Sequence, residues 1–145
     1  MRTTSSPALA GRLRLAVTRT ARRLRQEAGG GLSPSLTAAL ATIERHGPLT
    51  PSELAARERI QRPTATRLLA RLEEDELVAR TADPGDRRSS LVAVTADGRS
   101  LLHTVRTRKD AFLARRLRGL DPADRAALER AVVVLEGLLE EERGA

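Results

Sequence analysis

The sequence contains no cysteine, one phenylalanine, and no tyrosine or tryptophan among its 145 residues. Without a thiol the chain has no disulfide, no cysteine nucleophile and no thiol with which to sense peroxides. With a single aromatic ring, the core has to be built from leucine, valine, isoleucine and alanine. The length is sufficient for one domain with a real core and hardly for two.

Other kinds of site lack their usual residues as well. The two histidines, His46 and His103, lie far apart without a metal-ligand pattern beside them, so we expect no metal site. There is no glycine-rich phosphate loop, and most carboxylates lie beside arginines on amphipathic helices, so we expect neither an enzyme nor a cofactor. No apolar run approaches the roughly eighteen residues of a membrane span, and the first residues do not resemble a signal peptide. We therefore expect a cytoplasmic protein on the nucleoid, with no membrane partner.

Positive charge is in excess and is unevenly placed. The formal net charge is +7, and Lys109 is the single lysine among 26 basic residues. Such a preference for arginine is typical of a genome's composition, so the position of the charges is more informative than their number. Residues 1–25 hold seven arginines and no acid, whereas glutamates crowd residues 136–142. A basic surface of this kind predicts contact with phosphates.

Residues 50–75 have the pattern of two helices joined by a short turn. Thr50 supplies an N-cap hydroxyl, a proline follows it, and Glu53 completes a capping box, so a helix is predicted from Thr50 to about Glu58. After a connector of a few residues, a second helix is predicted over residues 62–75. Its apolar residues share one face at helical spacing and should pack on the first helix and the core. These are Ala65, Leu68, Leu69 and Leu72.

The opposite face of this second helix is polar and basic. Guanidinium groups and hydroxyls reach guanine edges and phosphate oxygens in duplex DNA. Acidic residues are confined to the far end of the helix, so its first turn is better placed to read bases. The residues predicted to read or brace the major groove are Arg62, Thr64, Thr66, Arg67 and Arg71. The alternative is an ordinary solvated helix face, which is the usual role of such charges.

Two short antiparallel strands are predicted after the second helix, over residues 77–80 and 91–95. The ten residues between them are rich in Asp, Arg, Pro and Gly, are too polar to pack, and are predicted to form a loop. Together with the two helices, this hairpin makes a helix-turn-helix with a wing, a unit commonly used to bind duplex DNA.

Two arginines and two aspartates give the wing its predicted chemistry. Arg87 and Arg88 can reach a narrow minor groove, where the negative potential is strongest, and the sequence does not choose between them. Asp83 and Asp86 are expected to orient these arginines, either by pairing with them or by capping the turn. The alternative is a solvated turn in which the four charges pair among themselves.

The two ends of the chain predict amphipathic helices. One helix over residues 9–28 and another over residues 122–142 each carry an apolar stripe, and a long segment over residues 96–117 precedes the second. A further helix of about thirteen residues should begin at Ser33 and Pro34. The stripe residues predicted to form a two-fold dimer interface are Leu13, Val17, Leu128, Leu135 and Leu138. An internal three-helix bundle in a monomer is the alternative.

The order and spacing of residues 64–73, 77–80, 83–88 and 91–98 resemble the MarR family of bacterial transcriptional regulators. The resemblance implies a homodimeric winged-helix regulator, usually a repressor, that binds a pseudo-palindromic operator in double-stranded DNA. It also implies that helix 62–75 enters the major groove and that wing 81–90 reaches the minor groove. The expected organisation is a single domain over residues 1–145. Residues 32–95 would form its DNA-binding lobe, and residues 1–30 and 96–145 its dimerisation region.

The predicted fold is thus mostly α with a small β-hairpin, and the predicted function is sequence-specific repression. An architectural DNA-binding or protein-interaction module without sequence specificity is the alternative. The resemblance also implies a possible small-molecule effector, often an aromatic acid, although this chain has no tyrosine or tryptophan to stack on a ring. No ligand residue, operator or target gene can be named from the sequence.

Overall fold

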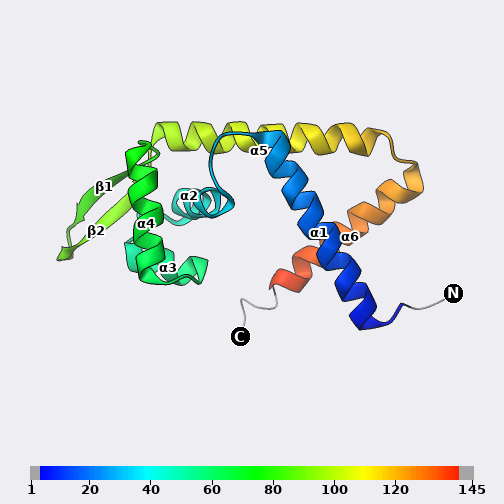
Figure 1. Ribbon diagram of the computed structural model, residues 1–145, viewed down its shortest axis with the longest axis horizontal. Helices are drawn as coiled ribbons and strands as arrows, with labels where there is room; N and C mark the ends of the chain where they lie inside the picture. Colours follow the sequence, from blue (N-terminus) through cyan, green and yellow to red (C-terminus); the bar gives the residue numbers. More distant parts are fainter. Residues whose placement is uncertain (1–3, 141–145) are drawn as a thin grey trace. The chain divides into compact units, whose positions relative to one another are not determined.

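The computed structural model describes residues 4–140. In this part of the chain the fold is mostly helical with one antiparallel hairpin, as the sequence predicts (Figure 1). The elements are, in order, α1 (Ser6–Ala28), α2 (Pro34–His46), α3 (Pro51–Glu58), α4 (Arg62–Glu74), β1 (Val78–Asp83), β2 (Asp86–Val94), α5 (Ala96–Arg118) and α6 (Pro122–Glu140). The chain divides into two compact units, Met1–Lys109 and Asp110–Ala145, and the boundary between them falls inside α5.

The first unit has an aliphatic core shared by α2, α3, α4, the hairpin and the first turns of α5. Leucine and valine side chains from each of these elements are fully enclosed: Leu40, Leu54, Leu69, Leu72, Val92 and Leu102. Burying one such side chain contributes roughly 1.5–3 kcal/mol, so a few of them account for a large share of a domain's net stability. The inward face predicted for α4 is confirmed, because Ala65, Leu69 and Leu72 are buried and Leu68 packs against the cluster.

Side-chain caps set the starts of the two helices that precede α4. The Ser33 hydroxyl accepts a hydrogen bond from the Leu36 N–H at 3.2 Å, at the beginning of α2. In α3 the Thr50 hydroxyl accepts from the Glu53 N–H at 3.2 Å, and a Glu53 carboxylate oxygen accepts from the Thr50 N–H at 3.4 Å. Both groups satisfy backbone donors that a helix start leaves without partners. The predicted capping box is therefore confirmed.

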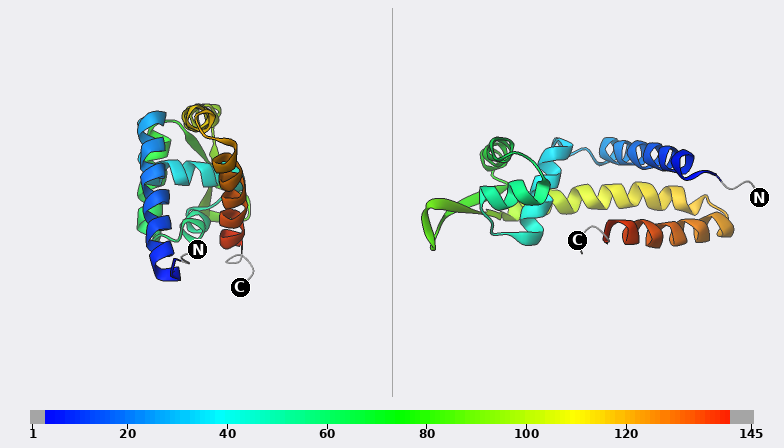
Figure 2. Two further views of the ribbon diagram at one scale, coloured as in Figure 1. Left: turned by 90° about the vertical axis from the view of Figure 1, so that its right-hand side faces the viewer. Right: turned by 90° about the horizontal axis from the view of Figure 1, so that it is seen from below.

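The hairpin is longer than the sequence predicts. Residues 81–90 were expected to form a polar loop, but β1 runs to Asp83 and β2 begins at Asp86, which leaves Pro84 and Gly85 as the turn. The prediction was wrong because it required apolar alternation, and a two-stranded ribbon that projects into solvent has no need of it. Figures 1 and 2 show this ribbon extending away from α2, α3 and α4.

Backbone and hydroxyl contacts fix the base of the hairpin. Leu49 and Val92 exchange two backbone hydrogen bonds, at 3.0 and 2.8 Å, so the segment before α3 forms an isolated antiparallel bridge to β2. The Thr95 hydroxyl donates to the Glu76 carbonyl at 2.7 Å and accepts from the Gly98 N–H at 3.1 Å. A side chain at Gly98 would collide with the Leu77 carbonyl, so this close approach requires glycine.

The outer helices differ from the lobe in having little buried surface. Ala28 is the buried residue of α1, and α6 has no buried residue among those described. The helix predicted over residues 122–142 is confirmed as far as Glu140, and its last two residues lie outside the described part. Among the described helices, none is both long enough and apolar enough to cross a membrane.

Candidate nucleic-acid interface

A tight turn sets α4 against α3. Arg59 adopts a left-handed backbone conformation with φ of 53°, which ends α3 and lets the Ile60 N–H reach the Ala55 carbonyl at 3.0 Å. The Ile60 side chain then packs against the core. Gln61 precedes α4 as its N-cap residue, and a proline stands in the first turn, where its missing N–H costs no hydrogen bond.

The solvent-facing side of α4 carries most of the residues predicted to contact DNA. Arg62, Thr66, Arg67 and Arg71 are exposed, whereas Thr64 is half-buried. Thr64 therefore has less side-chain surface to offer a ligand than its position in the sequence indicated. The outward face is continuous over the first two turns because its residues recur at helical spacing.

Hydrogen bonds within the protein decide which of these side chains still have donors or acceptors available for a ligand. The Thr66 hydroxyl donates to the Arg62 carbonyl at 3.0 Å, so toward solvent it presents a methyl group and acceptor lone pairs. Arg71 Nε donates to Asp75 Oδ2 at 3.1 Å, which commits one edge of that guanidinium to the last turn of the helix. Within the described residues, the guanidinium groups of Arg62 and Arg67 have no protein partner and can donate to a ligand.

The arginines of the wing tip lie outside the regular pairing of β1 with β2. The register pairs Ala82 with Ser90 and then Asp83 with Asp86, so Arg87, Arg88 and Ser89 have no opposite residue. Such an irregular segment bends a strand and re-aims its side chains. Both arginine side chains are exposed.

Backbone contacts of two aspartates shape this tip. Asp83 Oδ1 accepts from the Gly85 N–H and Asp86 Oδ1 from the Arg88 N–H, each at 2.9 Å. Of the two predicted roles, the structure therefore contains the capping of the turn. Neither aspartate forms an ion pair with Arg87 or Arg88 in the part of the chain that the structure describes. The two guanidinium groups remain available for an external anion.

One contact between the helix and the wing was not predicted from the sequence. Arg80 of β1 donates from Nε to Glu73 Oε2 at 2.8 Å and from Nη1 to Ser90 Oγ at 3.1 Å. It thereby connects α4 with both strands. Separations of seven and ten residues have no periodic signature, so only the folded hairpin brings these groups together.

The residues predicted to form a dimer interface are largely exposed. Leu13 and Val17 on α1 are 37% and 50% exposed, and Leu128 and Leu138 on α6 are 45% and 55% exposed. Leu135 is half-buried. Exposed leucine and valine at helical spacing form apolar surface that is usually covered by another chain.

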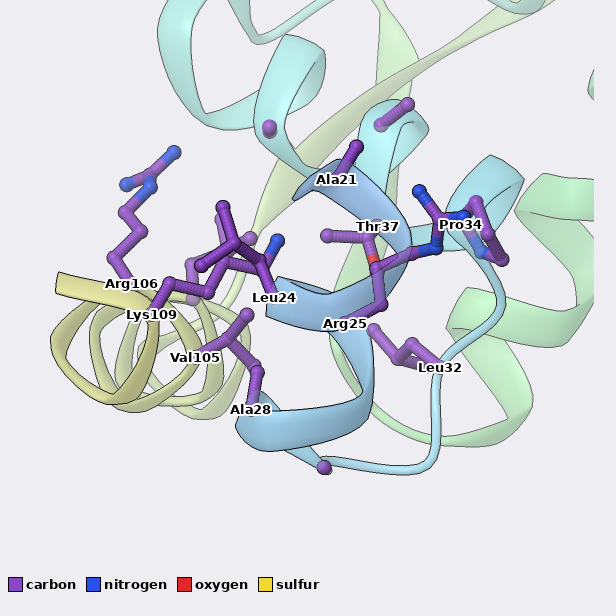
Figure 3. Close-up of a pocket in the computed structure, with 14 residues that line it drawn as sticks. Ala21, Leu24, Arg25, Ala28, Leu32, Pro34, Thr37, Val105, Arg106 and Lys109 are labelled. Atoms are coloured by element: carbon purple, nitrogen blue, oxygen red, sulfur yellow. The ribbon is translucent and has the colours of Figure 1, made fainter. Parts of the chain in front are cut away.

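The first unit also contains a cavity of about 380 Å³ that no sequence pattern indicated (Figure 3). Its lining comes from α1, α2, α5 and the loop between α1 and α2, and it is mainly aliphatic, including Leu24, Ala28, Leu32 and Val105. Three cations also line it: Arg25, Arg106 and Lys109. Arg106 Nη1 is bonded to Glu44 Oε1 at 2.7 Å, whereas Arg25 and Lys109 have no ion-pair partner among the described residues. Separately, no group of three His, Asp or Glu side chains able to hold a metal occurs within residues 4–140.

A short capped helix, a tight turn, a second helix with a basic outer face and an arginine-tipped hairpin together define a winged helix-turn-helix DNA-binding protein. This is the class of protein to which the fold and the site assign the chain.

Comparison with known proteins gives the family. The sequence profile of the MarR family matches residues 32–90. The HTH-type transcriptional regulator Mb0904 of Mycobacterium bovis, itself uncharacterized, is 36% identical over 138 residues, which cover 94% of this chain and 96% of that protein. The chain therefore belongs to the MarR family of transcriptional regulators.

A solved structure and a named repressor extend the comparison. The crystal structure of a candidate transcriptional regulator from Pseudomonas aeruginosa PA01 is 37% identical, has a TM-score of 0.84, and covers 95% of this chain and 98% of its own. The HTH-type transcriptional repressor MdtR of Bacillus subtilis is 33% identical over 87 residues, or 60% of this chain and 56% of that protein. The family's winged-helix fold is the fold described above.

Proposed function

We propose that this regulator is a homodimeric repressor that binds a pseudo-palindromic operator through residues 32–95. The observation that carries the proposal is the row of unpaired guanidinium groups on the first turns of α4, next to a wing tip with two more. The resemblance to a named repressor supports repression rather than activation. Its place of action would be the cytoplasm, where bacterial DNA lies.

In this proposal α4 lies in the major groove and its residues have different roles. Arg62 and Arg67 offer complete guanidinium forks, which suit the O6 and N7 acceptors of guanine. Arg71 is held by Asp75 and braces a phosphate with its free nitrogens. Thr66 turns its methyl group toward the groove, where it can contact thymine methyl groups. The half-buried Thr64 braces the start of α4 in the groove.

The wing supplies a second contact in the adjacent minor groove. Arg87 and Arg88 are exposed and unpaired, and a narrow minor groove attracts guanidinium groups without needing a full base pattern. Asp83 and Asp86 each accept a hydrogen bond from a backbone N–H group of the wing tip, which holds the turn in the conformation that presents the arginines.

Dimerisation through residues 1–30 and 96–145 would place two lobes on two half-sites. The exposed apolar residues of α1 and α6, including Leu13, Val17, Leu128 and Leu138, are the surface that a second copy would cover. The resemblance to the MarR family, which implies homodimeric regulators, supports this arrangement. Half-sites about one helical turn apart then match the two-fold symmetry of the protein.

The test is selection of bound sequences from a random duplex pool at near-physiological salt. We expect a two-fold motif that the protein prefers over random duplex by about three decades or more. Arg67→Ala should weaken operator binding more than random-duplex binding. Retention of DNA without a motif would favour an architectural role, and no retention would favour a protein-interaction module. Equal losses on both DNAs for Arg67→Ala would contradict base reading.

We further propose that a small organic anion releases the operator by filling the cavity between α1, α2 and α5. Its volume of about 380 Å³ lies within the range of small-molecule sites. Its aliphatic lining favours a hydrocarbon chain, and the unpaired Arg25 and Lys109 supply charge for a carboxylate. Occupation would alter the separation of the two lobes, to which paired half-sites are sensitive.

Calorimetric titration with octanoate, benzoate and octylamine tests this second proposal. Octanoate should bind most tightly and octylamine not at all, and octanoate should release the operator. Combined Arg25→Met and Lys109→Met substitutions should weaken octanoate binding about tenfold or more, because two charge-assisted contacts are lost. Arg115→Met, outside the cavity, is the matched control. Octanoate binding that these substitutions leave unchanged would contradict the assigned site.

A further inference from the structure

The guanidinium group of Arg80 bridges α4 and the wing. It donates from Nε to Glu73 Oε2 at 2.8 Å and from Nη1 to Ser90 Oγ at 3.1 Å. Glu73 belongs to the last turn of α4, and Ser90 is the last β2 residue in the regular ladder before the wing tip. One side chain thus connects three elements, two of which carry proposed DNA contacts.

Few other contacts of the described residues fix the orientation of the wing. Nearer its base the wing is fixed by the hydrogen bond from the Thr95 hydroxyl to the Glu76 carbonyl and by the bridge between Leu49 and Val92. Beyond Arg80, the residues of β1 as far as Ala82 are exposed. A two-stranded ribbon without a packed face is flexible, so a contact partway along it determines how far its tip swings.

Ordinary stabilisation does not account for the contact well. The Arg80 and Glu73 side chains are 32% and 35% exposed, and an ion pair this accessible to water contributes little to unfolding free energy. Arg80 is also poorly placed to act on phosphate itself, because two of its three nitrogens are already bonded within the protein. What the guanidinium fork supplies is geometry, since it donates along fixed directions from one plane.

We infer that Arg80 is a positioning residue that fixes the wing relative to α4, so that the major-groove and minor-groove contacts form together. The inference rests on the proposed DNA-binding function and deepens it. Two contacts on one duplex reinforce each other only while their spacing is constrained, because the second then forms as an intramolecular event. Without the Arg80 contacts, the wing arginines would bind as a loosely tethered pair.

Coupling between Arg80 and the wing arginines is the quantity to measure. In the otherwise unchanged protein, the paired substitutions Arg87→Ala and Arg88→Ala should weaken operator binding about tenfold or more. In an Arg80→Met background the same pair of substitutions should weaken operator binding less than about threefold, because the wing is no longer held at a fixed position relative to α4. Equal costs in both backgrounds would overturn the inference while leaving the DNA-binding function intact.

Substitution of Glu73 separates positioning from simple charge. Glu73→Met removes the acceptor of the Arg80 hydrogen bond together with a negative charge near DNA, so charge alone predicts tighter binding to every duplex. Loss of the Arg80 contact instead predicts that operator preference over random duplex falls and that wing substitution again loses most of its effect. A uniform gain in affinity, with the wing's contribution unchanged, would contradict positioning. Arg80→Lys should restore operator preference only in part, since an ammonium group lacks the planar donor fork of a guanidinium group.

A measurement without DNA tests whether Arg80 fixes the wing, separately from the test of the proposed function. Because the chain has no cysteine, spin labels at Ala70→Cys on α4 and Arg87→Cys on the wing attach without background labelling, and dilution with unlabelled protein leaves the helix-to-wing distance within one chain. The distance distribution should be narrow with Arg80 present and broad with Arg80→Met, at unchanged helical content by circular dichroism. A distribution that is equally narrow in both proteins would overturn the inference even if the operator selection failed.

Discussion

The lobe formed by α2, α3, α4 and the hairpin differs from the outer helices α1 and α6 in how its apolar residues are used. In the lobe, Leu40, Leu54 and Leu69 are enclosed completely. On α6, Val133 is 67% and Leu139 71% exposed, and no described residue of that helix is buried. The lobe therefore has an enclosed aliphatic core, to which Leu102 of α5 also contributes, whereas α1 and α6 have apolar faces that are largely exposed.

The largest effect is expected in the lobe core. Leu69→Ala should lower the free energy of unfolding by roughly 3–5 kcal/mol, because the side chain is fully enclosed and its removal leaves a cavity. Chemical denaturation at several protein concentrations is the measurement. Leu139→Ala, on exposed α6, is the matched control and should cost far less at concentrations where the chain is monomeric. Similar losses for both would contradict the difference between the regions.

The next effect concerns the outer helices. Combined Leu128→Glu and Leu138→Glu substitutions should raise the dissociation constant of the proposed homodimer at least about a hundredfold, because charges would enter its proposed apolar interface. Sedimentation velocity across a dilution series measures it. Val133→Glu provides a control, since that exposed residue lies on the opposite, glutamate-bearing side of α6. A dimer that tolerates the pair of glutamates would place its interface elsewhere.

A smaller effect is expected at the cap of α3. Thr50→Ala should cost about 1 kcal/mol and lower Tm by about 3 °C, because the Glu53 N–H loses its acceptor at a helix start. Ser52→Ala, two residues later and without a described capping bond, should be close to neutral. Thermal unfolding followed by circular dichroism compares the two variants. Equal melting temperatures would show that the capping box is dispensable to the lobe.

The smallest effect should come from the surface of the lobe. Asp75→Ala breaks the ion pair with Arg71, yet both side chains are accessible to water, so the unfolding free energy should change by less than about 0.5 kcal/mol. The released Arg71 should then bind random duplex slightly more tightly at low salt. Denaturation and anisotropy titrations at two salt concentrations test both statements. A loss above about 1 kcal/mol would mean that the pair stabilises the end of α4.

The sequence predicted the parts of the fold that depend on local chemistry. Caps at Ser33 and Thr50, together with the inward leucines of α4, are visible because a cap acts over three residues and a helix face repeats within two turns. The polar outer strands of the hairpin were missed because solvent-exposed pairing leaves no apolar alternation. Periodicity reveals burial more directly than it reveals hydrogen bonding.

The candidate site was predictable only in part. The arginines of α4 and the wing stand in recognisable positions, but the bonds that commit Arg71 to Asp75 and Thr66 to its own helix depend on rotamers. The Arg80 contacts and the cavity were not predicted, because each unites elements that are separate in the sequence. An apolar stripe likewise indicates that a helix packs, and cannot indicate whether the partner belongs to the same chain.

Amide hydrogen exchange of the Leu128→Glu and Leu138→Glu protein, beside the unsubstituted chain, tests the difference between the two regions most directly. Amides of α3, α4 and β2 should stay equally protected in both proteins, while those of α1 and α6 should lose protection when the proposed dimer dissociates. Protection of α1 and α6 that is unchanged in a monomer would contradict this expectation, because those helices would then be stable without a second copy.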